Sequence, residues 1–193
     1  MFARNAAQEK RLRASEDEMH HWKDRSELDS MIRVADARGA LFNPECATIH
    51  PFGLLQGLLQ YLSAKGVHLI EGAYATKAAE GVLVNSSFIH APIVIQATEV
   101  FGEPGREFIP LYSLMVATEP ISQEIWNEIG AEARFTFAEG AHMVNYAQRT
   151  ADNRLAIGGR GATYPMGSQL KVEKEMTSTV HAHLREMART WFP

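Results

Sequence analysis

Apolar and polar positions follow different periods along the chain. Residues 51–62 carry leucines and aromatic side chains at helical spacing. Pro51 suits the first turn of a helix and Gly66 suits its end. The pattern predicts a helix that is buried. Directly after it, the short apolar stretch Val67–Glu71 predicts a strand joined to the helix by a tight glycine turn.

The middle of the chain has the spacing of a β-meander followed by a covered strand. Short apolar stretches are separated by Gly81 and by polar Ser86 and Ser87, and they predict strands at Tyr74–Ala78, Val82–Asn85 and Phe88–His90. Ala91–Ala97 is continuously apolar except for one glutamine, which predicts a strand buried on both faces.

The second half of the chain begins after the loop residues Gly102–Gly105. A strand is expected over 110–118, and a helix over 122–129 that ends at Gly130. Turn residues at 151–153 predict a β-hairpin from 142–149 and 154–159. Glu175–Thr190 predicts a last helix, with one apolar face made of Met176, Val180, Leu184 and Met187.

Residues 1–38 have a different composition, with eight basic and eight acidic side chains and few large apolar ones. Such a segment favours a solvated helical structure that cannot form a core alone. Ser26 followed by Asp29 predicts the capping arrangement of a short helix that ends near Gly39.

Overall composition narrows the function classes. The chain has 193 residues, 46% hydrophobic residues, and 19 Lys and Arg against 23 Asp and Glu, for a net charge of -4. This is enough for one globular domain and leaves no basic excess for nucleic acid. Apolar runs stop well short of the roughly 18 residues of a membrane span. The start lacks a secretory h-region, and the single cysteine, Cys46, is expected to be a small buried side chain, so cytoplasm is the expected compartment.

Short catalytic and metal motifs do not identify a reaction. The eight histidines lack the spacing of a shared metal site, because His181 and His183 would point to different sides of a helix. Neither a G-x-S-x-G nucleophile nor a G-x-G-x-x-G phosphate loop occurs. His50 is interpreted as a helix cap and not as a base. Motif spacing alone therefore predicts no active site.

Longer stretches of sequence resemble a known family. Five blocks resemble FAD-dependent oxidoreductases of the D-amino-acid oxidase type and occur in the same order, namely Leu41–Pro51, Val67–Ala75, Ala91–Thr98, Pro110–Pro120 and Asn145–Arg160. That family includes glycine, sarcosine and γ-glutamylputrescine oxidases. The last two blocks are most similar to its putrescine-oxidase-like branch. The resemblance runs from about Arg38 to Pro193.

The resemblance implies a mixed α/β (α+β) fold: an incomplete FAD-binding domain with its β-meander, an antiparallel substrate-domain sheet and flanking helices. The implied divisions are a helical segment at 1–38, a partial FAD-binding domain at 39–103, the substrate-domain sheet at 104–170 and a C-terminal helix at 171–193.

Carried over by position, the resemblance implies five site residues. Ala75 would pass the adenine of FAD, and Ala97 and Thr98 would approach the cofactor, although Glu99 stands where many members have glycine. Tyr146 and Arg160 would lie near the substrate, where a guanidinium could bind a carboxylate bidentately. The alternative is that Tyr146 packs within its strand and Arg160 pairs with a surface acid.

The implied reaction is FAD-dependent oxidation of a small-molecule amine or amino acid, in which the cofactor accepts a hydride from the carbon beside nitrogen. The first glycine-rich loop of the family is not in the sequence. We therefore expect an internal fragment of an oxidase, inactive alone, whose partner would be the rest of the enzyme. Two alternatives stay open: a non-catalytic module that complements a separate FAD-binding chain, and a small-ligand binder without redox chemistry.

Overall fold

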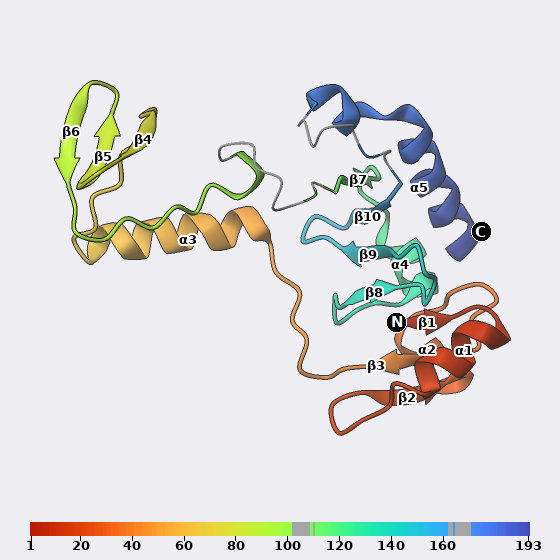
Figure 1. The fold of residues 1–193 in the computed structure, drawn as a ribbon. Coiled ribbons are helices and arrows are strands. Elements are labelled where there is room, and N and C mark those ends of the chain that lie inside the picture. The colour runs from red at the N-terminus through yellow and green to blue at the C-terminus, as the bar shows by residue number, and fades with distance from the viewer. Residues whose placement is uncertain (102–108, 110, 162–163, 165–170) are drawn as a thin grey trace. The chain divides into compact units, whose positions relative to one another are not determined.

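The computed structural model describes residues 1–101, 109, 111–161, 164 and 171–193, except for the side chains of Val100, Arg160 and Val172 (Figure 1). The chain forms two compact units: unit 1 is Met1–Thr48 with Gly105–Pro193, and unit 2 is Ile49–Pro104. The described residues contain five α-helices and three antiparallel sheets. The predicted mixed α/β fold is confirmed.

The first part of unit 1 combines two helices with a small sheet. Its elements are β1 (Phe2–Ala3), α1 (Ala6–Arg13), β2 (His21–Asp24), α2 (Arg25–Met31) and β3 (Gly39–Phe42), and the sheet order is β1-β3-β2. The prediction of helical structure over 1–38 is right for the two helices and misses the two short strands. Both strands pair with β3, whose residues lie beyond that segment.

The cap of α2 is Asp24 and not Ser26. The Asp24 carboxylate accepts from the backbone N–H of Glu27 at 2.9 Å, and the Glu27 carboxylate accepts from the backbone N–H of Asp24 at 2.9 Å. This reciprocal capping box satisfies two backbone donors at once. The Ser26 hydroxyl instead donates to Asp24 Oδ1. The cap therefore lies two residues earlier than predicted.

The main sheet of unit 1 has the order β7-β10-β9-β8. Its strands are β7 (Ser113–Ala117), β8 (Thr136–Ala138), β9 (Asn145–Arg149) and β10 (Leu155–Arg160). The predicted hairpin is confirmed as β9 and β10, and Asn153 in its turn has a positive φ of 63°. The three residues of β8 were missed, because so short a strand carries almost no periodic signal.

The two helices of this half form where they were predicted. Helix α4 (Gln123–Ile129) is capped by Ser122, and Gly130 after it has φ 93°. Helix α5 (Ser178–Trp191) buries Val180 and Leu184 as expected. Met176 is exposed, because it belongs to the 3₁₀ turn η3 (Val172–Met176) before α5 and not to the apolar face of the helix.

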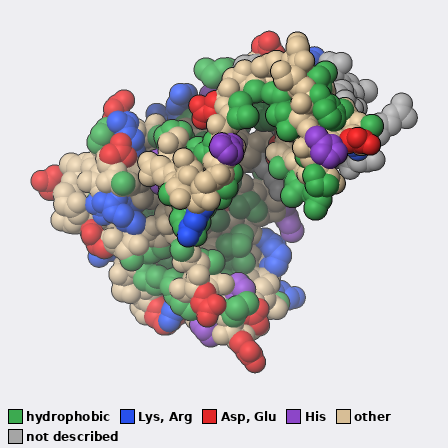
Figure 2. Space-filling view, turned by 90° about the vertical axis from the view of Figure 1, so that its left-hand side faces the viewer, with side chains coloured by type: hydrophobic (Ala, Val, Ile, Leu, Met, Phe, Trp, Pro, Cys, Tyr) green, Lys and Arg blue, Asp and Glu red, His purple; other side chains and the backbone are tan. Residues whose placement is uncertain are grey.

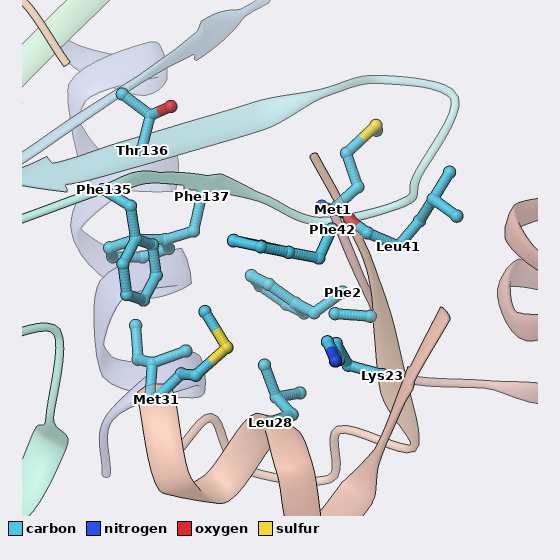
Figure 3. A pocket seen from close by; sticks show the side chains of 12 residues that line it. Met1, Phe2, Lys23, Leu28, Met31, Leu41, Phe42, Phe135, Thr136 and Phe137 are labelled. Carbon is cyan, nitrogen blue, oxygen red and sulfur yellow. Dashed lines mark hydrogen bonds between the residues drawn. The ribbon is translucent and has the colours of Figure 1, made fainter. Parts of the chain in front are cut away.

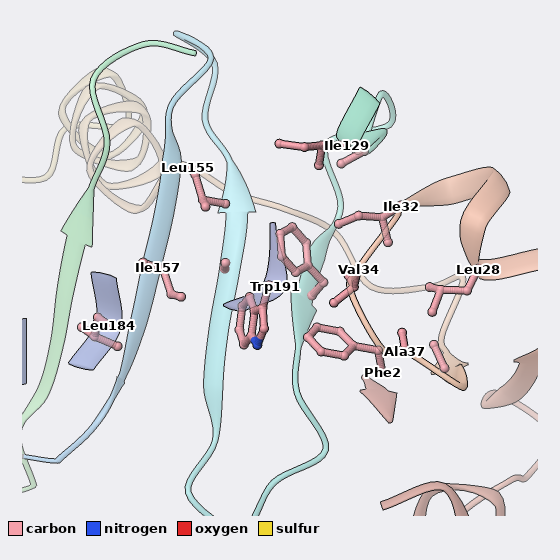
Figure 4. Close-up of a cluster of buried hydrophobic side chains, with 14 of the residues drawn as sticks. Phe2, Leu28, Ile32, Val34, Ala37, Ile129, Leu155, Ile157, Leu184 and Trp191 are labelled. Carbon is pink, nitrogen blue, oxygen red and sulfur yellow. The ribbon is translucent and has the colours of Figure 1, made fainter. Parts of the chain in front are cut away.

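The core of unit 1 joins residues that are far apart in sequence (Figure 4). Phe2 packs edge-on against Trp191, with ring centroids 5.1 Å apart. The largest side chains with almost no exposure are Trp126, Trp191, Phe2, Ile32, Ile157, Leu184 and Val34. Residues 1–38 thus share one core with the last helix, which explains how a highly charged segment folds.

A buried carboxylate ties the same core together. Glu139 Oε1 accepts from Gln8 Nε2 at 2.8 Å, and Glu139 Oε2 accepts from Trp191 Nε1 at 3.0 Å. These donors come from α1 and from the end of α5, so one side chain links the two ends of unit 1. Burying a carboxylate is costly unless it is hydrogen-bonded in this way.

Unit 2 consists of one helix and a three-stranded meander. Helix α3 (Pro51–Ala64) begins with proline in its first turn, and His50 Nδ1 accepts from the Gly53 N–H at 2.9 Å. The helix, the glycine stop at Gly66 and the capping role of His50 are confirmed. The meander has the order β4-β5-β6 (Ala75–Ala78, Gly81–Val84 and Ser87–His90), and the 3₁₀ turn η1 (Glu99–Phe101) follows.

Burial in unit 2 differs from the predictions. No residue of α3 is buried, and neither Val67–Glu71 nor Ala91–Ala97 forms a strand. Ile93 and Ile95 are largely exposed. A strand needs a hydrogen-bonding neighbour, and no described strand pairs with either segment. Exposed hydrophobic side chains are visible as green surface in Figure 2. Cys46, in unit 1, is likewise exposed and not buried.

Candidate functional site

The five predicted site residues lie in both units. Ala75 opens β4, and Ala97 with Thr98 lies in the extended segment before η1; all three are exposed residues of unit 2. Tyr146 is on β9 in unit 1. The backbone of Arg160 pairs with Ser113 at the end of β10, and its side chain is outside the described part of the structure.

The main sheet of unit 1 has one covered and one open face. Leu114, Ile157 and Ala147 are buried on the face that packs against α5 and the core. The alternate positions form what we call the open face, whose members include Ser113, Met115, Tyr146, Gln148 and Gly158. Ser113, Met115 and Tyr146 are exposed there, so the open face is the part of this sheet that can meet a ligand.

Tyr146 lies at the centre of the open face. Its Cα is paired with Gly158 of β10, and its hydroxyl is 2.9 Å from the hydroxyl of Ser113 on β7. The ring therefore extends across the neighbouring strand. Tyr146 as a whole residue is 36% exposed. An aromatic ring with an accessible phenol offers both stacking and hydrogen bonding.

The hairpin that carries Tyr146 is fixed at its turn by charged groups. Hydrogen bonds from the Thr150 hydroxyl and then from the Arg154 guanidinium lower the pKa of Asp152. Arg149 is buried, and its Cζ lies 4.8 Å from the centroid of the Trp126 ring. Its guanidinium also donates a hydrogen bond to Asn153 Oδ1. These contacts hold the register of β9 against β10, and so the position of Tyr146.

The residues of unit 2 fit part of FAD. Ala75, Ala97 and Thr98 have small side chains and are exposed, so a flat ring could approach the backbone at these positions. The pyrophosphate of FAD has another requirement, because such groups bind at a glycine-rich loop before a helix. The sequence contains no G-x-G-x-x-G, and α3 starts at His50-Pro51. The described residues fit the ring contacts and not the phosphate contacts.

Two hollows in unit 1 do not coincide with the predicted residues. The first has about 40 Å³ and is lined mainly by apolar side chains, including Phe2, Phe42 and Phe137 (Figure 3). That volume is far below the roughly 300 Å³ at which ligand pockets begin. The second is a cleft of about 380 Å³ lined by residues that include Ile125, Leu155 and Phe192. Of the predicted site residues whose side chains the structure describes, none lines either hollow.

Sequence reasoning missed Ser113 and Gly158 as part of this site. Gly158 did carry a signal, because a glycine inside a strand often marks close approach of another group. The sequence pattern placed Gly158 inside the second strand of the predicted hairpin and assigned it no role in the site. Ser113 carried none, since a serine at a strand end is common and only the sheet register brings it to Tyr146.

Two searches of the described residues set further bounds. No three or more His, Cys, Asp or Glu side chains lie where they could together hold a metal ion. No described helix has the length and apolar character to cross a membrane.

Comparison with known proteins agrees with this architecture. The described residues form a helix with a three-stranded meander in unit 2 and an antiparallel sheet with an open face in unit 1. The sequence matches the family described as FAD dependent oxidoreductase (DAO) over residues 1–193. The chain belongs to this family of oxidoreductases. It is 24% identical over 180 residues to the probable oxidoreductase OrdL of Haemophilus influenzae. That alignment covers 86% of this chain and 39% of OrdL, so the chain spans about two fifths of its relative. No solved structure matches the chain.

Proposed function

We propose that this chain supplies the substrate-binding sheet, and part of the FAD-binding domain, of an oxidase that acts on an amine or amino acid. The membership of all 193 residues in an FAD-dependent oxidoreductase family carries the proposal. The open face around Tyr146 supports it, because it offers an aromatic ring and a phenol on a rigid sheet. Sites built on strands hold their geometry better than sites on loops.

In this proposal the chain binds and orients the substrate. The Tyr146 phenol donates to or accepts from the polar end of the molecule, and the Arg160 guanidinium binds a carboxylate where one is present. Ala75, Ala97 and Thr98 let the adenine and the rest of FAD approach the backbone. FAD, when bound, supplies the redox chemistry by accepting a hydride from the carbon beside nitrogen. The pyrophosphate would need a glycine-rich loop, which this sequence does not contain.

The substrate class can be tested with a matched set of small molecules. The purified chain is mixed with FAD, separated from free flavin, and exposed without oxygen to glycine, ethylamine or N-methylglycine. Glycolate serves as the control, because it has the size and carboxylate of glycine and a hydroxyl in place of the amine. We expect substoichiometric flavin that at least one of the three amines bleaches once, and no sustained turnover with oxygen, because this sequence contains no pyrophosphate loop. Tyr146→Phe should weaken this response.

Two results would contradict the proposal. If glycolate bleaches the flavin and the amines do not, the substrate class is wrong. If the chain holds no flavin even at high FAD concentration, the chain does not bind FAD by itself, and the second candidate below is favoured.

The second candidate is a module that completes a separate FAD-binding chain. The observation in its favour is the exposure of unit 2: no residue of α3 is buried, and Val67–Glu71 and Ala91–Ala97 are unpaired although they are apolar. Unpaired extended segments can accept strands from another chain. Exposed apolar patches of this kind mark interaction surfaces.

This candidate predicts complementation. The chain would be co-expressed with the first part of a family member, chosen to contain the G-x-G-x-x-G loop and to end where this chain begins in the alignment. A stable complex that binds stoichiometric FAD would support the module. Stoichiometric FAD on the chain alone would exclude it, because no second chain would then be needed.

A further inference from the structure

The side chain of Tyr146 lies over Gly158 of β10, a strand position where any Cβ would displace the ring. A Cβ placed on Gly158 would be 2.8 Å from three atoms of Tyr146, namely Cε2, Cζ and the hydroxyl oxygen. Side-chain carbons essentially never come this close, so any larger residue at 158 would push the ring away from the sheet. The contact involves the far half of the ring, which is the half that carries the phenol.

The end of the ring is held from the third strand. Neighbouring strands are about 4.8 Å apart, so a tyrosine that crosses one strand can bring its hydroxyl to the next. Here the Tyr146 hydroxyl is 2.9 Å from Ser113 Oγ on β7. Either oxygen can donate, and in both cases the phenol keeps hydrogen-bonding capacity for a second partner.

The neighbouring glycine has a different role. A Cβ on Gly159 would be 2.2 Å from Asn145 Oδ1 and 3.2 Å from a methyl group of Leu184. Because successive residues of a strand face opposite sides, Gly159 serves the packing of β9 and α5, and Gly158 serves Tyr146. The pair Gly158-Gly159 therefore combines a site requirement with a packing requirement.

We propose that Gly158 and Ser113 are positioning residues that lay the Tyr146 ring flat across β10 and fix its phenol beside β7, ready to contact the substrate. The inference rests on the proposed function in one respect only, namely that Tyr146 meets the substrate. Gly158 provides the space and Ser113 provides the anchor. Neither residue needs to touch the substrate itself.

The arrangement can be tested by fluorine NMR on the full chain labelled with 3-fluorotyrosine. The sequence has five tyrosines, and Tyr146→Phe identifies the signal of interest by its loss. We expect Gly158→Ala and Ser113→Ala each to shift or broaden that signal. Ser113→Thr should restore it, because threonine keeps the hydroxyl and suits a strand. Gly57→Ala in α3 is the matched control, since a Cβ there would meet nothing within 4 Å; that protein should keep the signal.

A second measurement connects the ring to the substrate. With FAD present, glycine, ethylamine and N-methylglycine are titrated while the Tyr146 signal is followed. Loss of one hydrogen bond predicts that Ser113→Ala needs roughly twofold to tenfold more ligand for half of the shift. Ser113→Thr should return the midpoint to that of the unchanged protein.

The outcomes separate the two claims. If the signal is the same in Gly158→Ala, in Ser113→Ala and in the unchanged chain, the positioning roles are refuted. If the signal moves in these variants but no amine or amino acid perturbs it in the unchanged chain, the positioning roles stand and the proposed function loses its support at Tyr146. If Ser113→Thr fails to restore the signal of a folded protein, the hydroxyl is not the anchor, and the role of Ser113 is refuted.

Discussion

Unit 1 and unit 2 contain similar elements and bury them very differently. In unit 1, Trp126, Trp191 and Leu184 have no exposed surface, and strands and helices from both ends of the chain share the core. In unit 2, α3 has more leucines than any other helix of the described residues, and none of them is buried. Helix α3 thus forms from its local sequence, whereas its burial depends on a partner surface.

The physical reason lies in what each unit can place against its apolar side chains. A helix and a three-stranded meander can bury little apolar surface between them. Burial contributes only about 25 cal/mol for each Å² of apolar surface removed from water. Unit 1 has two sheets and four helices to combine. We therefore expect equivalent substitutions to have unequal effects in the two units.

The sharpest test of this contrast is a pair of leucine truncations. Leu184 is 0% exposed and Leu58 is 48% exposed. Leu184→Ala should lower the free energy of unfolding by about 2–5 kcal/mol, because it leaves a cavity in the core. Leu58→Ala should cost less than about 1 kcal/mol, as surface substitutions do. Urea unfolding followed by circular dichroism measures both. Equal losses in the two variants would mean that α3 is as well packed as α5.

The buried carboxylate of unit 1 gives the next largest effect. In Glu139→Gln, the amide nitrogen would face one of the two donors, Gln8 Nε2 or Trp191 Nε1, and leave it without an acceptor. An unsatisfied buried donor costs about 1–3 kcal/mol. Glu80→Gln, at an exposed turn of unit 2, should change the free energy of unfolding by no more than about 0.5 kcal/mol. If Glu139→Gln leaves the free energy of unfolding unchanged, the two hydrogen bonds of this carboxylate do not stabilise the core.

The elements that sequence reasoning located carry their own stop and start signals. Pro51 and Gly66 bound α3, Ser122 and Gly130 bound α4, and the turn at Asn153 joins β9 to β10. The misses depend on long-range pairing. The strand β2 needs β3, and Val67–Glu71 and Ala91–Ala97 would need neighbours that the described residues do not provide. Periodicity identified apolar segments and could not supply their partners.

The candidate site was predictable to a similar extent. Tyr146 was named as a site residue by resemblance, which stays a prediction, and its place on a strand is confirmed. Its surroundings were not predictable, because Ser113 is 33 residues away in sequence and meets it only through the register of β7, β10 and β9. A position in a motif can be carried over from a family, whereas a contact across three strands depends on how this chain pairs.

Substitution of an exposed apolar residue should reduce association with other chains more in unit 2 than in unit 1. Ile95 is 85% exposed and lies among other exposed apolar residues, whereas Ile125 is an exposed residue of α4 in unit 1. Ile95→Lys should reduce self-association or binding to a complementing chain, because it places a charge in an apolar patch. The free energy of unfolding should change by at most about 0.5 kcal/mol. Size-exclusion chromatography with light scattering measures the effect.

Ile125→Lys is the matched control for that substitution. It adds the same charge to unit 1 and should leave association unchanged. If Ile125→Lys reduces association and Ile95→Lys does not, the interaction surface lies on unit 1.

The smallest expected effect is a decrease in the stability of unit 1 at acid pH. A backbone hydrogen bond from Glu27 and then one from the Ser26 hydroxyl lower the pKa of Asp24, and Arg38 and then Arg13 lower the pKa of Glu9. Because the folded pKa is below the unfolded one, these carboxylates stabilise the fold at neutral pH. Their contribution declines once the pH falls below the unfolded values, about 3.9 for Asp and 4.3 for Glu.

Urea midpoints followed by tryptophan fluorescence measure this dependence in unit 1, because Trp22, Trp126 and Trp191 all belong to it. The midpoint should fall as the pH is lowered from 6 to about 3, through the range in which these carboxylates take up protons. Asp24→Asn provides the control, since asparagine caps a helix about as well as aspartate and does not titrate. Its midpoint should depend less on pH than that of the unchanged chain. An identical pH dependence in both proteins would assign the acid sensitivity to other carboxylates, with Glu9, which pairs with Arg13 and Arg38, as the next residue to substitute.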